Sequence, residues 1–353
     1  RIEVAGPVMT RHELNLAHDE RVTAVEAQPH DIRDEVDLRP RGIDEFQGQS
    51  DVVAHLRILL SAARQRGQVA DHILLAGPPG LGKTSLAGIV ASEMGTNLRI
   101  TSGPILTRPG DLAALLTDLA EGDVLFIDEI HRLHRAVEEV LYPAMEDRRL
   151  DVLVGRGPSA RSIRLELPTF TLVGATTRTG LVAGPLRDRF GFVARLDLYD
   201  HDDLAKIVQR SAQLLNMTLS QDAALEIGRR SRGTPRIANR LLRRVRDVAQ
   251  IEGVADVSVD TARSALAKFG VDEIGLDKLD RSILEYLCTK GSDRPVGLVT
   301  LAQVVGEEAV TIEDAYEPFL IREGLLVRTP RGRVATDAAY QHLGVLRRGG
   351  GLL

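Results

Sequence analysis

The stretch GPPGLGKT (77–84) has the residue types and spacing that hold the phosphates of a nucleotide. Glycines let backbone N–H groups curl around phosphate oxygens, while a lysine and the hydroxyl residue after it serve the β- and γ-phosphates and Mg²⁺. The stretch follows an apolar run (72–77) and opens a helical pattern, whose N-terminus adds the positive end of its dipole. We therefore predict a site for ATP and Mg²⁺. The residues that this loop contributes are Gly77, Gly80, Gly82, Lys83, Thr84 and Ser85, with Thr84 as a metal ligand.

A second apolar run, LFIDEIHRL, ends in two adjacent carboxylates. Asp128 can hold Mg²⁺ through water, and Glu129 can polarise the water that attacks the γ-phosphate. His131 and His134 could share a helix face, but the H-E-x-x-H pattern is absent and no third ligand follows. We interpret the two histidines as a solvated or hydrogen-bonded pair.

The elements that must position these residues alternate between apolar runs and helical patterns. Five short runs are predicted to be fully buried parallel strands: 72–77, 97–103, 123–128, 170–177 and 192–198. The helical patterns between them complete a doubly wound α/β sheet. We place this large domain at residues 31–199, after a tail (1–30) that we predict to be mobile.

The rest of the chain changes character twice. Residues 200–271 show helical spacing without strands, which predicts a small helical lid domain whose segment LLRRVRD (241–247) exposes one basic face. Residues 272–345 run as helix, helix, helix and short hairpin, the order of a winged helix, before a tail at 346–353. The predicted fold is α/β: a P-loop domain with a parallel sheet, a small helical lid domain and a C-terminal winged-helix domain.

Two segments go beyond what a nucleotide-binding core needs. Residues 148–168 alternate around GRGPSAR and predict a β-hairpin, in which Ile163 and Leu165 share a face because they are two residues apart. The sequence LLVRTPRGRVAT predicts a narrow wing whose guanidiniums suit DNA phosphates or the minor groove, although a solvated charge run is the alternative. The arginines of this wing are Arg328, Arg331 and Arg333.

Composition limits the classes of protein. Aromatic residues are only 3% and Trp is absent, so a module that stacks bases on aromatic platforms is disfavoured. The net charge of -5 means that contact with nucleic acid must come from a local basic patch. Cys288, the single cysteine, allows no internal disulfide and is expected in the core. The polar first 35 residues predict no signal peptide, and no run approaches the roughly 20 apolar residues of a membrane span. We expect a cytoplasmic protein without membrane contact.

Several motifs taken together resemble the RuvB family, the AAA+ motors that drive Holliday junction branch migration. The motifs are GPPGLGKT, FIDEIHRL, VLYPAMED, LVGATTRTG, PLRDRFG and RGTPRIANRLLRRVRD, and the resemblance runs from about Asp37 to about Gly344. Many ATPases share the first two motifs, whereas the combination with PLRDRFG and RTPRGR is far more specific. The resemblance implies an AAA+ P-loop domain and a hexameric ring on duplex DNA. It also implies ATP hydrolysis at subunit interfaces and DNA translocation in recombination and repair.

The resemblance assigns Arg189 of PLRDRFG as an arginine finger that reaches the γ-phosphate held by the neighbouring subunit. A guanidinium supplied in this way neutralises charge in the transition state, an effect of about 10³–10⁵ in rate. From the turn alone, Arg187 and Arg189 could instead form surface ion pairs with Asp188 or another acid.

Other site residues are implied by the same resemblance. Thr176 in GATTR is a sensor of the γ-phosphate at a strand end. Arg236 is a second sensor at the start of a lid helix, where Thr234 can cap and Pro235 suits the first position. The positions around the nucleotide are Leu38, Arg39, Tyr199, Glu146 and Asp147, followed by Arg148 where the family usually has an aromatic residue.

The implied partners are a four-way DNA junction, RuvA and RuvC. RuvA would dock on the hairpin through Ile163 and Leu165. A clamp-loader-like or origin-binding AAA+ protein is the alternative, but it should lack this hairpin. A DNA-binding regulator would read bases with a helix, and the candidate TIEDAYEPFLIREG disfavours that class because it has four acids and one arginine.

Overall fold

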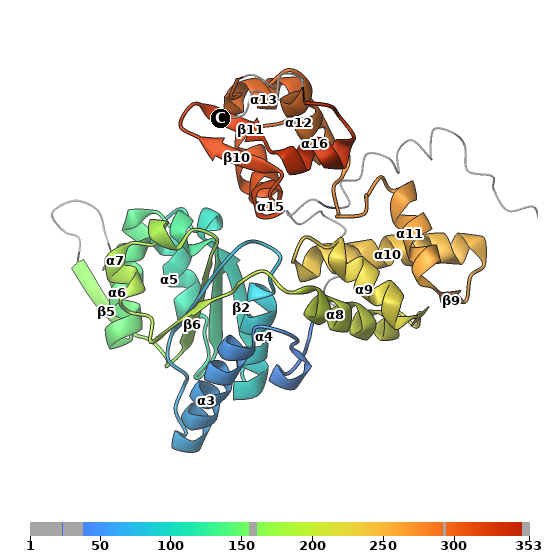
Figure 1. The fold of residues 1–353 in the computed structure, drawn as a ribbon. Helices are drawn as coiled ribbons and strands as arrows, with labels where there is room; N and C mark the ends of the chain where they lie inside the picture. Colours follow the sequence, from blue (N-terminus) through green and yellow to red (C-terminus); the bar gives the residue numbers. More distant parts are fainter. Residues whose placement is uncertain (1–22, 24–37, 155–160, 292–293, 348–353) are drawn as a thin grey trace, which may run out of the picture. The chain divides into compact units, whose positions relative to one another are not determined.

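The computed structural model describes residue 23 and residues 38–154, 161–291 and 294–347 (Figure 1). The chain divides into two compact units. One lies within residues 33–203, and the other joins residues 204–353 to the segment that holds Thr23. Each unit is described by itself.

The first unit is built on a five-stranded parallel sheet in the order β2-β3-β6-β1-β7. The strands are β1 (Ile73–Ala76), β2 (Leu98–Ser102), β3 (Val124–Asp128), β6 (Thr171–Thr176) and β7 (Phe192–Arg195). All five predicted strands are confirmed. Complete burial holds for the central strands β1 and β6 and for β3 up to Ile127, but it is wrong for the edge strands, where Ile100 is 58% and Val193 45% exposed. An edge strand has one neighbour instead of two, so helices on the sheet cover it less completely.

Helices cover both faces of this sheet because successive strand residues point to opposite sides. Leu74, Leu125 and Leu172 pack with the buried side chains of α5 (Pro109–Thr117) and α6 (Arg135–Asp147). The other helical elements of the unit are α3 (Ser50–Arg66), α4 (Lys83–Met94), α7 (Gly184–Arg187), and the 3-10 turns η2 (Ile43–Glu45), η3 (Gly103–Ile105), η4 (Ile130–Arg132) and η6 (Thr179–Leu181).

A hairpin extends from this unit, as predicted for residues 148–168. Strands β4 (Arg149–Val154) and β5 (Arg161–Glu166) pair antiparallel, with Leu150 opposite Leu165 and Val152 opposite Ile163. Leu165 is 39% exposed. The tip at 155–160 and the side chain of Ile163 lie outside the described part of the chain.

The lid contains four helices, α8 (His201–Leu214), α9 (Gln221–Arg229), α10 (Pro235–Glu252) and α11 (Val259–Lys268). It also has a two-residue parallel pair that the helical patterns did not predict, β8 (Thr218–Leu219) with β9 (Asp256–Val257). The expected exposed basic face of residues 241–247 is wrong for Arg243, which is 5% exposed, whereas the side chains of Arg244 and Arg246 are 19% and 38% exposed and pair with Asp247. Helix α10 packs against both α9 and α11, so little of its surface is left to solvent.

The winged-helix domain has α12 (Lys278–Thr289), α13 (Leu298–Val305), the strands β10 (Leu326–Thr329) and β11 (Gly332–Ala335), and α16 (Asp337–Leu343). Its predicted third helix is divided into α14 (Ala309–Thr311), the π-helical turn η7 (Ile312–Tyr316) and α15 (Glu317–Arg322). Pro318 lies in the first turn of α15, where it has no N–H to donate to the preceding turn. Cys288 is buried in the core, as predicted.

Thr23 is the one described residue of the predicted mobile tail. It is fully buried, and its hydroxyl donates to Asp277 and accepts from Arg232. The prediction of a mobile tail is therefore wrong at this residue. Among the described residues, no helix is long and apolar enough to cross a membrane.

Candidate nucleotide site

The phosphate loop occupies the turn from β1 into α4, as the motif requires. Gly77 has a φ of 150°, and a Cβ at this position would lie 2.5 Å from the carbonyl oxygen of Leu196. Gly82 has a φ of 94° and caps α4. Lys83 is 7% exposed, and its Nζ donates to the carbonyl oxygens of Gly77 at 2.8 Å and Pro78 at 2.7 Å. Only glycine fits at Gly77, and the ammonium lies inside the curl of the loop, which fits a polyphosphate.

The predicted catalytic acids lie at the same edge of the sheet. Strand β6 separates β1 from β3, and the register pairs Ala76 with Thr176, so the carboxyl ends of the three strands are aligned. Asp128 ends β3 and accepts a hydrogen bond from the Glu129 amide at 2.9 Å. The Thr84 hydroxyl and the Asp128 carboxylate are both half-buried at this edge and are hard oxygen donors of the kind that Mg²⁺ prefers. The donor set therefore fits the metal.

Glu129 has a left-handed backbone, with a φ of 47°, and its carboxylate is paired with Arg132 at 2.9 Å. The backbone geometry turns the chain sharply after β3, which places Glu129 beyond the strand end and beside η4. The Arg132 pair was not predicted from the sequence, although its i, i+3 spacing, which brings side chains together on a helical turn, was the available signal.

Thr176 is fully buried at the end of β6. Its Oγ1 accepts from the Arg178 amide at 3.0 Å and shares a hydrogen bond with His131 Nδ1 at 3.0 Å. Burial lowers the pKa of His131, with Glu129 opposing this effect, so the imidazole is neutral near pH 7. The hydroxyl of Thr176 is thus engaged in hydrogen bonds within the protein, whereas Thr177 beside it is exposed.

Of the expected adenine positions, Tyr199 contacts the phosphate loop. Tyr199 is 7% exposed and donates from its hydroxyl to the Leu81 carbonyl at 3.2 Å, and burial raises its pKa. Leu38 is 4% exposed and Arg39 is half-buried. Phe46 was not predicted, yet its ring would meet a Cβ on Gly82 at 3.3 Å. An aromatic residue just before the first helix was the available signal.

Arg189 lies at the opposite edge of the sheet. It precedes β7, and the Phe192 amide donates to the His72 carbonyl at 3.2 Å, so this is the amino end of β1. The phosphate loop follows the carboxyl end of this four-residue strand. At about 3.3 Å per residue, the strand separates the two sites by about 13 Å.

The guanidinium of Arg189 is held by helix α6. It pairs with Glu146 at 3.0 Å, lies 4.6 Å from the centre of the Tyr142 ring, and donates to the Pro185 carbonyl at 2.5 Å. The alternative drawn from the turn alone, an ion pair between Arg189 and an acid, is therefore present. The acid that pairs with Arg189 is Glu146 instead of Asp188. Glu146 and Asp147 end α6 and thus lie at this edge with Arg189, at the opposite edge from the phosphate loop of their own chain.

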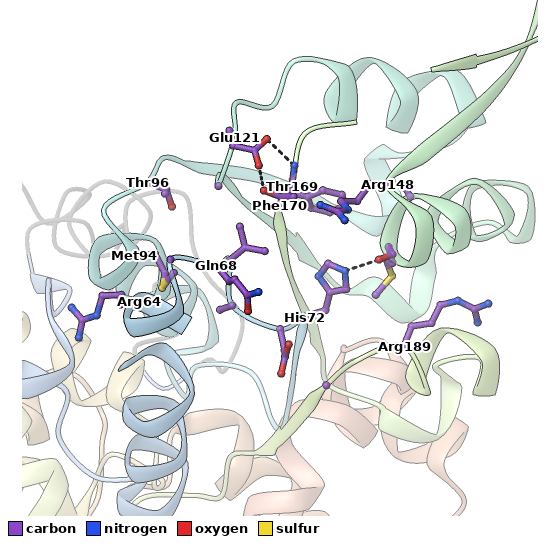
Figure 2. Close-up of a pocket in the computed structure, with 18 residues that line it drawn as sticks. Arg64, Gln68, His72, Met94, Thr96, Glu121, Arg148, Thr169, Phe170 and Arg189 are labelled. Atoms are coloured by element: carbon purple, nitrogen blue, oxygen red, sulfur yellow. Dashed lines mark hydrogen bonds between the residues drawn. The ribbon is translucent and has the colours of Figure 1, made fainter. Parts of the chain in front are cut away.

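A cavity of about 860 Å³ opens at this edge, and Figure 2 shows Arg189, Arg148 and His72 around it. His72 Nε2 donates to the Met145 carbonyl at 3.3 Å, and its Nδ1 accepts from the Leu172 amide at 2.9 Å. Burial lowers the pKa of His72, which keeps the ring in this neutral form. Arg148, the departure from the family pattern, ends α6 with a φ of 52°.

Arg236 belongs to the second unit and begins α10, with Pro235 in the first turn as predicted. The expected side-chain cap from Thr234 is wrong. Its hydroxyl donates instead to the Ser231 carbonyl at 3.3 Å, so it closes the preceding turn.

The three wing arginines differ from one another. Glu317, which is fully buried, pairs with Arg328 at 2.5 Å and with Arg333 at 2.6 Å. Glu313 lies 3.6 Å from each of these guanidiniums. Arg331 lies in the exposed turn between β10 and β11, and its guanidinium has no ion pair among the residues that the structure describes. Two of the three predicted DNA contacts are therefore paired with carboxylates of η7 and α15 in the same domain.

These features define the class of protein. It is an AAA+ ATPase, with a phosphate loop and two acids at the carboxyl edge of a parallel sheet, a helical lid, and a winged helix of the kind that binds DNA. The comparisons with known proteins agree. The Holliday junction DNA helicase RuvB P-loop domain matches residues 38–196, the RuvB AAA lid domain residues 199–272, and the RuvB C-terminal winged helix domain residues 273–344.

Similar proteins carry the same description. The Holliday junction branch migration complex subunit RuvB of a Nocardioides strain is 57% identical over 342 residues, covering 96% of this chain and 95% of that protein. Its Corynebacterium aurimucosum counterpart is 58% identical over 325 residues, covering 92% and 90%. The Thermotoga maritima RuvB branch migration motor superposes with a TM-score of 0.78 at 48% identity, covering 88% of this chain and 99% of that one.

The chain belongs to the RuvB family, as its motifs indicated. Its activity is ATP hydrolysis coupled to DNA translocation in Holliday junction branch migration. The clamp-loader-like alternative is not favoured.

Proposed function

We propose that this chain hydrolyses Mg²⁺-ATP only between two copies of itself, in a hexameric ring around duplex DNA. One copy supplies Lys83, Asp128 and Glu129, and the next copy supplies Arg189. The observation that carries the proposal is the position of Arg189 at the amino edge of the sheet, where it cannot serve its own phosphate loop. Release of Arg189 from Glu146 would let the guanidinium turn to a neighbour's γ-phosphate.

Glu146 and Asp147 belong to the same proposed half-site, because they lie beside Arg189. They would contact the nucleotide of the neighbouring copy. Leu38, Arg39, Tyr199 and the phosphate loop would hold the nucleotide of their own copy, with Thr84 and Asp128 on the metal. Arg236 would act as the second sensor from the lid. The exposed Thr177 adds a candidate sensor hydroxyl beside the committed Thr176.

The proposed partners follow the family. The hairpin would dock RuvA through Ile163 and Leu165, and the complex would deliver the junction to RuvC in the cytoplasm. Support comes from β4 and β5, which extend from the core and expose Leu165. The wing would hold the DNA backbone without reading sequence.

A subunit-mixing experiment tests the shared site. ATP hydrolysis and migration of a synthetic four-way junction are measured with Glu129→Gln, with Arg189→Ala and with mixtures of the two. Each variant alone should bind ATP and lose hydrolysis by at least about 10³-fold. Mixtures should recover activity, because some interfaces combine an intact Glu129 with an intact Arg189.

The matched control is Arg187→Ala, which removes an exposed arginine two residues from the finger. It should keep wild-type hydrolysis. A mixture without any recovery would contradict the shared site, and hydrolysis by Glu129→Gln at the wild-type rate would mean that the catalytic acid lies elsewhere.

A further inference from the structure

Arg232 lies in the turn between the lid helices α9 and α10, yet it is buried, with 3% of its surface exposed. Its backbone is left-handed, with a φ of 54°, a conformation that costs a non-glycine residue free energy. Such a conformation persists only where surrounding contacts enforce it. The contacts that do so come mainly from the winged-helix domain, with one further hydrogen bond to the Thr23 hydroxyl at 2.8 Å.

The guanidinium of Arg232 is inserted at the N-terminus of α12. It forms a hydrogen-bonded ion pair with Asp280, which is fully buried, and lies 3.4 Å from Asp277. Its Nε donates to the Gly275 carbonyl at 3.0 Å. Asp277 and Asp280 also form the capping box of α12, so one arginine ties the lid turn to the start of this helix.

The same guanidinium packs against the ring of Phe319 in α15, 4.7 Å from its centre. In return, Arg322 of α15 donates to the Arg232 carbonyl at 3.1 Å. Arg232 is thus held on its side chain by α12 and α15 and on its backbone by α15. A guanidinium that is both stacked on a ring and paired with buried carboxylates is held in a single orientation, whereas the side chains of an exposed ion pair can move.

The segment that links the two domains is also held against the lid. Arg230 donates from Nη1 to the Val271 carbonyl at 3.3 Å. Gly275 has a φ of 90°, and a Cβ there would lie 2.5 Å from the Arg230 carbonyl oxygen. The link therefore packs directly on the lid turn, at a distance that only glycine allows.

We propose that Arg232 locks the lid to the winged-helix domain, so that the two domains move as one rigid body and lid movement reaches the DNA-binding wing without loss. Arg232 is a positioning residue that lies four residues before Arg236. This inference rests on the proposed function for what the lid and the wing do during ATP hydrolysis. The lock itself is a property of the free chain and can be tested separately.

The first test measures rigidity. Spin labels are placed by Ile251→Cys in α10 and Val299→Cys in α13, which are 81% and 65% exposed, in a Cys288→Ala background. Pulsed electron resonance should give one narrow distance, unchanged by a non-hydrolysable ATP analogue. In Arg232→Ala the distribution should broaden. A broad or nucleotide-dependent distance in the labelled protein that keeps Arg232 would overturn the proposal, whatever the Arg232 variant does.

The second test measures coupling in the full chain with junction DNA. Arg232→Ala and the milder Arg232→Lys should keep DNA-stimulated ATP hydrolysis within about twofold and lose about tenfold or more in branch migration per ATP hydrolysed, because lysine cannot form the same paired and stacked geometry. The matched control is Arg229→Ala, an exposed arginine at the end of α9, which should keep both. Coupling by both Arg232 variants at the wild-type level would contradict the lock. If the wild type itself migrates no junction, the proposed function fails, while the distance measurement still decides on rigidity.

Discussion

Glu317 determines what the wing arginines can do. It is fully buried at the start of α15, and its two carboxylate oxygens accept from Arg328 and Arg333. A buried carboxylate that holds two guanidiniums fixes the base of the wing but also takes much of their charge away from DNA. Arg331, in the turn, is the arginine of the three that keeps its full charge at the surface.

Replacement of this carboxylate should therefore destabilise the winged-helix domain. We expect Glu317→Gln to lower the free energy of unfolding by about 3–5 kcal/mol, the range for breaking a buried ion pair on one side. Glu313→Gln is the control, since Glu313 is 43% exposed and 3.6 Å from both guanidiniums, and it should cost less than about 1 kcal/mol. Urea unfolding followed by circular dichroism measures both. Equal costs would show that burial of Glu317 does not matter.

The division among the arginines also predicts how each affects DNA binding. Arg331→Ala should leave stability unchanged and reduce the dependence of log affinity on log salt by about 0.9 per bound subunit, the value for one phosphate contact. Arg328→Ala should mainly lower stability, since it breaks the pair with Glu317. Titrations of duplex DNA at several salt concentrations separate the two. A larger salt effect from Arg328→Ala than from Arg331→Ala would contradict this assignment.

At the scale of elements, His72 joins three of them. It precedes β1, donates to the Met145 carbonyl near the end of α6, and accepts from the Leu172 amide at the start of β6. Because Nδ1 faces an N–H donor, a second proton there would break the bond. Burial lowers the pKa of His72 because water that would solvate the charged imidazolium is excluded from the ring.

This arrangement predicts a pH dependence of stability. The folded pKa lies below the unfolded value of about 6.5, so the contribution is present above about pH 6.5 and is lost as pH falls through the lower, folded pKa. Thermal unfolding of the wild type should therefore shift downward between about pH 7.5 and about pH 5.5. His72→Gln should unfold earlier at every pH but with a smaller shift. An identical shift in the variant would assign the pH dependence to other groups.

At the scale of the whole molecule, the proposed shared site, in which Arg189 serves the phosphate loop of a neighbouring copy, predicts that activity depends on assembly. The ATPase rate per chain should rise steeply with protein concentration and reach a plateau, since only assembled copies have a complete site. The rise should span up to about 10³-fold, the lower value for a supplied arginine. Rate measurements over a dilution series, with sedimentation of the same samples, check it. A constant rate in samples that sediment as monomers would contradict the proposal.

The sequence by itself predicted the local features of the nucleotide site and of the sheet. The glycines at 77, 80 and 82, the acids that end an apolar run, and the five strands follow from rules about neighbours in the chain, such as backbone freedom and periodicity. These predictions agree with the fold because each depends on residues a few positions apart. The hairpin of β4 and β5 was found for the same reason.

The tertiary structure alone decided which charges meet. The sequence places Arg240 and Arg243 on a basic helix, and only packing against α9 and α11 buries them. The pairs Arg189–Glu146, Arg333–Glu317 and Arg232–Asp280 join residues 43, 16 and 48 positions apart. The periodicity of the sequence does not predict such contacts. The free energy of an ion pair depends on the distance between the two charged groups and on their burial, and it does not depend on their separation along the chain.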